Sequence, residues 1–66
     1  MKNNLKVERA IKDLTQEQLA KLVSVSRQTI NAMEANKYVP STVLALKIAH
    51  VFNRRVEEIF FLEEGD

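Results

Sequence analysis

The sequence predicts an all-α fold of five short helices. Apolar residues recur three and four positions apart within residues 15–35 and 42–52, which is the spacing of one helix face. Thr15, Ser26 and Ser41 stand where such stretches begin, and hydroxyl side chains are favoured at helix N-caps. A chain of 66 residues with one glycine, one proline and no cysteine allows one domain, without disulfides or thiolate metal sites.

The first helix is expected over about residues 5–13, with Asn4 as its N-cap. Taken alone, the polar residues 1–4 are typical of a frayed terminus. The apolar contacts of this helix are expected from Leu5, from Ala10 or Ile11, and from Leu14.

Two helices joined by a sharp turn are predicted within residues 15–35. Thr15 and Gln18 have the spacing of a capping box, in which each side chain accepts from the other residue's backbone N–H. The helix that they begin is expected over about residues 16–23, and Ser24 and Val25 interrupt it. Its apolar face consists of Leu19, Leu22 and Val23.

The second of these helices presents a polar side to solvent. It is expected over about residues 27–35, with Ser26 as N-cap and with Ile30 and Met33 buried. Arginine binds guanine, an amide side chain binds adenine, and the threonine methyl contacts thymine in the major groove of DNA. The side chains that can read bases in this way are Arg27, Gln28, Thr29 and Asn31.

A longer helix is expected over about residues 42–52, followed by a short one over about 54–59. His50 is expected on the surface, and without neighbouring ligand residues it indicates no metal site. The apolar stripe of the longer helix is wide enough for a core helix. It consists of Val43 or Leu44, Leu46, Ile48, Ala49 and Phe52.

The run Phe60-Phe61-Leu62 is typical of a strand, in which successive side chains point to opposite faces. A chain this short cannot bury all three side chains, and an exposed apolar patch needs a partner. The run therefore favours dimerisation. The alternative is that Phe60 and Leu62 cover the core while Phe61 is exposed.

The charge distribution favours a nucleic-acid partner for the N-terminal part. Residues 1–38 carry seven basic and four acidic side chains, whereas residues 39–66 carry three and five, although the net charge is only +1. No signal peptide or apolar run of about 18 residues is present, so we expect a cytoplasmic protein without a membrane partner. No catalytic Ser/His/Asp or Cys/His set and no glycine-rich phosphate loop is visible, so we expect neither an enzyme nor a cofactor.

The chain resembles the Cro/phage-repressor (XRE) family of helix-turn-helix transcription regulators over roughly residues 5–60, and especially its small stand-alone members. The resemblance implies a lambda-repressor-like five-helix domain whose two ends pair as a small antiparallel β-hairpin, residues 2–4 with about 60–63. Asp13, Ser24 and Asn36 stand where the family favours glycine. The matching residues are Leu14-Thr15-Gln16, Leu19-Ala20, Ser24-Val25-Ser26, Thr29-Ile30, Glu34, Asn36, Pro40-Ser41, Leu46, Ile48-Ala49 and Ile59.

The resemblance also implies roles for individual residues. Arg9 and Glu34 would form an ion pair inside the fold. Gln16 would contact a DNA phosphate and brace the first side chains of the recognition helix. The full set of phosphate contacts would be Gln16, Ser26, Lys37 and Tyr38, and the base contacts would be Arg27, Gln28, Thr29 and Asn31. The alternative for Tyr38 is a lid over the core. The dimer contact would lie within about residues 53–64 and use Val56, Phe60, Phe61 and Leu62.

The function that follows is a transcriptional repressor that binds double-stranded DNA as a homodimer. Two recognition helices related by a two-fold axis lie ~34 Å apart, so the operator should be an inverted repeat. Occlusion of a promoter is the simplest mechanism, because no small-molecule pocket or sensor domain is evident. The alternative is an antitoxin-like module that covers a partner protein with its C-terminal patch and binds DNA secondarily.

Overall fold

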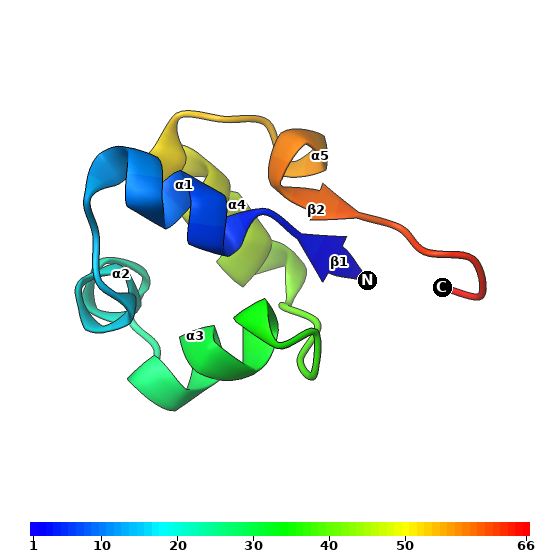
Figure 1. Ribbon diagram of the computed structural model, residues 1–66, viewed down its shortest axis with the longest axis horizontal. Coiled ribbons are helices and arrows are strands. Elements are labelled where there is room, and N and C mark those ends of the chain that lie inside the picture. The colour runs from blue at the N-terminus through cyan, green and yellow to red at the C-terminus, as the bar shows by residue number, and fades with distance from the viewer.

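The computed structural model describes all 66 residues and confirms the predicted class (Figure 1). The two strands pair antiparallel, with Lys2 opposite Phe61 and Asn3 opposite Phe60, so the expected terminal pairing forms with shorter strands than predicted. The elements are β1 (Lys2–Asn3), α1 (Leu5–Lys12), α2 (Gln16–Val23), α3 (Arg27–Glu34), α4 (Thr42–Phe52), α5 (Val56–Ile59) and β2 (Phe60–Phe61).

All four predicted N-cap residues stand at the start of a helix, and three of them cap it through the side chain. Thr15 Oγ1 accepts from the Gln18 backbone N–H at 3.0 Å, and Gln18 Oε1 accepts from the Thr15 N–H at 2.8 Å. Ser26 caps α3, and Ser41 caps α4. Asn4 is the N-cap residue of α1, as predicted, but its side chain makes no cap hydrogen bond.

Four helix ends turn through a left-handed residue that is not glycine. Asp13, Ser24 and Asn36, the three positions where the family favours glycine, have φ of 55°, 61° and 59°. Asn53 ends α4 in the same conformation, with φ of 52°. Asparagine and aspartate tolerate this region because their side chains bond locally, whereas serine bears a larger steric penalty. Ser24 is therefore a strained position at the turn between α2 and α3.

The core lies where the five helices meet, and several apolar residues that the sequence placed in it are exposed instead. In α1 the expected contact from Ala10 or Ile11 was wrong, because both residues are exposed, Ile11 at 71%, whereas Glu8 is buried. In α2 Leu22 is 58% exposed, and Ala20 packs inside instead. The buried apolar residues are Leu5, Leu19, Ala20, Val23, Ile30, Met33, Leu44, Ile48, Ala49, Phe52, Ile59 and Phe60.

Helix geometry explains the error in α4. Leu46 follows Leu44 by two positions, which is about 200° around an α-helix. Burial of Leu44 against the core therefore turns Leu46 to solvent, and Leu46 is exposed. Val43 is exposed as well, which settles the choice between Val43 and Leu44 that the sequence left open.

The C-terminal part is joined to α1 by charged side chains. Arg54 lies 3.6 Å from Glu8 in α1 and 3.6 Å from Glu58 in α5. Glu58 Oε1 also accepts from the Arg55 backbone N–H at 2.8 Å, so α5 begins at Val56 rather than at Arg54. None of the helices is long and apolar enough to span a bilayer.

The three residues of the apolar run have different environments. Phe60 is buried in the core, Phe61 is partly exposed, and Leu62 is 82% exposed. The alternative in which Leu62 covers the core was therefore wrong. Phe60 faces inward because it pairs with Asn3 in the sheet, and alternation along the strand turns Phe61 outward.

Candidate nucleic-acid interface

The outer side of α3 carries the predicted base-reading residues. Arg27, Gln28 and Asn31 are exposed, and together they line a shallow hollow on this side. Thr29 is placed differently, because it is half-buried and its hydroxyl lies 3.0 Å from Ser26 Oγ. The structure therefore brings three of the four side chains to solvent and couples the fourth to the N-cap.

Ser26 fixes the N-terminal end of this helix. Its Oγ accepts from the Thr29 backbone N–H at 3.2 Å, which satisfies one of the N–H groups that lack a partner within the helix. The N-termini of α2 and α3 carry free N–H groups and the positive end of the helix dipole. Anions are favoured at such ends.

Gln16 connects α2 to the middle and end of α3. Its Nε2 donates to Asn31 Oδ1 at 3.3 Å and to Glu34 Oε1 at 3.1 Å. The resemblance implied a brace on the first side chains of α3, and this detail was wrong, since the partners are the fifth and last residues of the helix. The contact holds the amide oxygen of Asn31 and leaves the Asn31 Nδ2 group free to donate.

The predicted pair of Arg9 and Glu34 is confirmed and anchors α3 to α1. Arg9 Nε and Nη2 donate to the two carboxylate oxygens of Glu34 at 2.6 and 2.9 Å. The side chains are only 15% and 7% exposed. Arg9 Nη1 also donates to the Leu14 carbonyl oxygen at 2.9 Å, so one guanidinium joins α1, the α1–α2 connection and α3.

The pKa shifts of this pair follow from its contacts. Desolvation raises the pKa of the Glu34 carboxyl, but the hydrogen bonds from Arg9 and Gln16 and the charges of Arg9 and Lys6 outweigh it, and the net pKa lies below 4.5. The hydrogen bond to Glu34 raises the pKa of Arg9. Both groups are therefore ionised at neutral pH.

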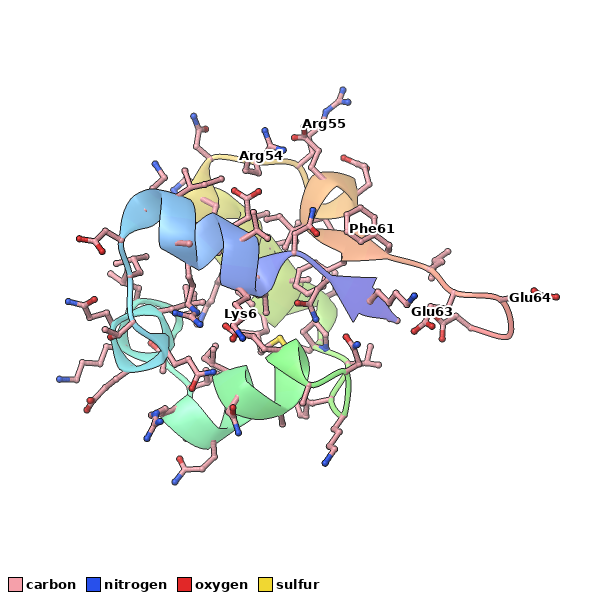
Figure 2. The ribbon with its side chains drawn as sticks, viewed as in Figure 1. Lys6, Arg54, Arg55, Phe61, Glu63 and Glu64 are labelled. Atoms are coloured by element: carbon pink, nitrogen blue, oxygen red, sulfur yellow. The ribbon has the colours of Figure 1, made fainter.

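Lys6 is a residue of this surface that the sequence reasoning missed. Its charge helps to lower the pKa of Glu34, which places it near the end of α3, and Figure 2 shows it between α1 and α3. Lys6 is exposed and has no carboxylate partner. Its position three residues before Arg9, on the same side of a helix, was the signal that could have identified it.

The loop after α3 adds Lys37 and Tyr38. Both are exposed, and the Lys37 backbone N–H donates to the Ala32 carbonyl oxygen at 2.9 Å, which holds the loop against the helix end. Tyr38 also lines a hollow with Val25 and Leu44, so its ring partly covers the core.

Three basic side chains around α3 are free of ion pairs. Lys6, Arg27 and Lys37 surround α3 and belong to no ion pair. Arg54 and Arg55 lie on the opposite side in Figure 2 and are paired with glutamates. A surface with exposed amide and guanidinium groups and unpaired cations is suited to a polyanion with hydrogen-bonding edges.

The predicted dimer residues lie at one end of the molecule, around α5 and β2. Phe61 and Leu62 are exposed there, whereas Val56 is only partly exposed. Phe60 belongs to the core of its own chain, so it has little surface to offer a partner.

Comparisons with known proteins agree with this architecture. The helix-turn-helix family matches residues 5–59. The chain is 54% identical to an uncharacterized HTH-type transcriptional regulator of Methanocaldococcus jannaschii over 66 residues, which is the full length of both chains. It is 48% identical to YgzD, an uncharacterized HTH-type transcriptional regulator of Bacillus subtilis, over 64 residues and 97% of each chain.

A solved structure has the same fold. The clp gene regulator ClgR from Corynebacterium glutamicum superposes with a TM-score of 0.75 at 26% sequence identity. The match covers 82% of this chain but only 57% of the ClgR chain, so the two proteins share a domain rather than a full length.

Proposed function

The chain belongs to the Cro/C1-type (XRE) helix-turn-helix family of DNA-binding transcriptional regulators, and we propose that it represses transcription as a homodimer bound to an inverted-repeat operator. The relatives are named HTH-type transcriptional regulators, and that family is non-enzymatic. The finer points of the proposal rest on the surface around α3 and on the exposed end of the molecule.

The observation that carries the proposal is the exposed side of α3, held in place by buried charge. Arg27 and Gln28 in the first turn of α3 and Asn31 one turn later are all exposed, and an α-helix in the major groove presents its N-terminal residues to bases in this way. The ion pair of Arg9 with Glu34 fixes the helix that presents them. A helix that is already held in place needs no ordering on binding, which favours sequence-specific contacts.

Phosphate contacts would set the register of the complex. Gln16 at the N-terminus of α2, and Ser26 at that of α3, lie where the helix dipole attracts anions. Lys37 and Tyr38 would contact DNA phosphates beyond the C-terminal end of α3. Lys6 adds a fifth candidate, because it is exposed and unpaired beside the end of that helix.

The dimer would form through Phe61 and Leu62, with Val56 beside them. Leu62 is 82% exposed, and a side chain of this size is stabilised when a partner covers it. Figure 1 places β2 and the C-terminal segment at one end of the molecule and α3 along its lower side, so a partner at that end leaves α3 accessible. Each α3 would lie ~17 Å from the two-fold axis, half of the ~34 Å repeat of B-DNA. This distance is compatible with a longest molecular extent of 32 Å.

Selection of bound duplexes from a random DNA pool tests the proposal. The wild-type protein should enrich an inverted repeat with half-sites about one DNA turn apart. Arg27→Ala should relax one base position and weaken specific binding by ~1–3 kcal/mol. Lys47→Ala is the control, because it removes an exposed basic side chain of α4 that belongs neither to the proposed DNA contacts nor to the proposed dimer contact. Equal effects of the two substitutions, or an enriched sequence without symmetry, would contradict the proposal.

The exposure of Leu62 also favours a second candidate, an interaction module whose C-terminal patch covers another protein. Light scattering of the purified protein separates the two. A stable homodimer over a range of concentrations supports the repressor. A monomer that aggregates as its concentration rises supports the interaction module.

A further inference from the structure

Asn3 connects the terminal sheet directly to the recognition helix. Its backbone pairs with Phe60 in the sheet, and its Nδ2 donates to the Met33 carbonyl oxygen of α3 at 2.7 Å. Its Oδ1 accepts from the Leu5 N–H at 3.1 Å. The nitrogen of the Asn3 amide must face the carbonyl and its oxygen must face the N–H, because an amide nitrogen only donates and an amide oxygen only accepts.

The Met33 carbonyl lies at the C-terminal end of α3, where carbonyl groups lack their usual partners within the helix. It also accepts from the Asn36 N–H at 3.0 Å, and the Met33 side chain is fully buried. Asn3 therefore holds the end of α3 opposite to the Ser26 cap. The two ends of the recognition helix are held by different parts of the chain.

The same sheet leads into the proposed dimer contact. Phe61 follows Phe60 in β2, so the exposed apolar side chains begin directly after the partner of Asn3. Asn4 reinforces the neighbouring junction, because its backbone N–H donates to the Ile59 carbonyl oxygen at 2.8 Å and its Nδ2 to that of Glu58 at 3.3 Å. Asn4 thus attaches α1 to α5, whereas Asn3 attaches the sheet to α3.

We propose that Asn3 is a positioning residue that sets the angle between α3 and the dimer contact, and thereby selects the spacing between operator half-sites. This inference rests on the proposed inverted-repeat dimer. With α3 ~17 Å from the two-fold axis, a rotation of ~10° displaces the helix by ~3 Å. One base pair of added spacing moves each half-site by half of the ~3.4 Å rise and turns the two half-sites by about a tenth of a turn around the duplex. A rotation of α3 by this order of magnitude therefore favours a different spacing.

The test compares Asn3→Asp with Asn4→Asp on operators whose half-sites are identical but whose spacing differs by one base pair. Asn3→Asp keeps an acceptor for Leu5 and places a second acceptor against the Met33 carbonyl, which removes the link to α3. Asn4→Asp makes the same chemical change one residue later and removes a link to α5 only. Affinities are measured by fluorescence anisotropy at constant salt, and thermal unfolding is recorded for each variant.

We expect wild type and Asn4→Asp to prefer one spacing. Asn3→Asp should reduce that preference roughly fivefold, which is the contribution of one neutral hydrogen bond. The bases preferred within each half-site should not change, because α3 keeps its own side chains. A mere loss of stability would lower affinity on all spacings alike. If Asn3→Asp does not fold, Asn3→Ser replaces it, because the shorter hydroxyl group can accept from the Leu5 N–H but cannot span the distance to Met33.

The inference is wrong if the Asn3 variant retains the wild-type spacing preference, or if both variants lose it equally. A wild-type protein without any spacing preference would refute the inverted-repeat dimer itself, and with it the role of Asn3. The two failures are thus distinguishable in one experiment.

Discussion

Replacement of Glu34 by glutamine should destabilise the fold strongly, because it breaks the ion pair with Arg9 and leaves the guanidinium uncompensated. The substitution preserves the shape of the side chain but leaves a guanidinium that is only 15% exposed without its anion. Removal of one partner from a buried pair costs ~3–5 kcal/mol. Partial exposure of Arg9 places the expected loss near the lower limit, at about 3 kcal/mol.

That loss is large for a chain of this size. Domains have unfolding free energies of ~0.05–0.15 kcal/mol per residue, which is roughly 3–10 kcal/mol here. A change of 1 kcal/mol shifts the melting temperature of a small domain by ~4–8 °C, so Glu34→Gln should lower it by about 12–24 °C at pH 7. Thermal unfolding followed by circular dichroism measures the shift.

A double substitution separates lost attraction from uncompensated charge. Arg9→Met combined with Glu34→Gln removes both charges, so the double variant should be more stable than Glu34→Gln alone by about 1 kcal/mol or more. The reasoning would be refuted if Arg9→Met lowered the unfolding free energy of Glu34→Gln by as much as it lowers that of wild type. The two substitutions would then act independently.

The pH dependence supplies an independent check. The folded-state pKa of Glu34 lies below its ordinary value of 4.5, so the ion pair contributes its full stability above about pH 4.5. That contribution is lost as the pH falls through the folded-state pKa, because the carboxylate must then bind a proton. The melting temperatures of wild type and Glu34→Gln should therefore converge in acid. A difference that stays constant from neutral to strongly acidic pH would contradict this assignment.

Three further predictions concern other parts of the chain. Lys37→Ala should lower affinity on all DNA sequences and reduce the slope of log K against log salt by about 0.9, and Lys6→Ala should do the same, both measured by salt titration of operator binding. Ser24→Gly should stabilise the protein by about 0.5–1 kcal/mol in thermal unfolding, because glycine relieves the left-handed strain, whereas Asn53→Gly should have a smaller effect. Leu62→Asp should shift the protein from dimer to monomer in sedimentation experiments without a change in melting temperature of the monomer, because the side chain is exposed within one chain.

Part of the interface was predictable from the sequence because it depends on local contacts. The caps formed by Thr15, Ser26 and Ser41 act over three residues, so their pattern is visible in the chain itself. The exposure of Arg27, Gln28 and Asn31 likewise follows from the burial of Ile30 and Met33 on the other side of the same helix. The partnership of Arg9 with Glu34 was also anticipated, but through the family resemblance and not through spacing.

Choices among apolar residues were harder to predict, because several faces of a short helix satisfy the same periodicity. The pattern in α2 and α4 permitted burial of Leu22 and Leu46, but both are exposed, and in α2 the core takes Ala20, which the pattern did not indicate. The run of three apolar residues at the C-terminus was ambiguous for the same reason. Pairing of Phe60 with Asn3 in the sheet decided which of them enters the core.

The sequence by itself determined the helices, their beginnings and the polar side of α3, because these depend on interactions within one or two helical turns. Only the tertiary structure decided that Gln16 reaches Asn31, that Arg54 bridges Glu8 to Glu58, and that Asn3 binds the end of α3. Except for the pair of Arg54 and Glu58, these contacts join residues that are separated by 15 to 46 positions in the sequence. Their formation requires packing of the whole core, which brings distant side chains into hydrogen-bonding range and which no local pattern encodes.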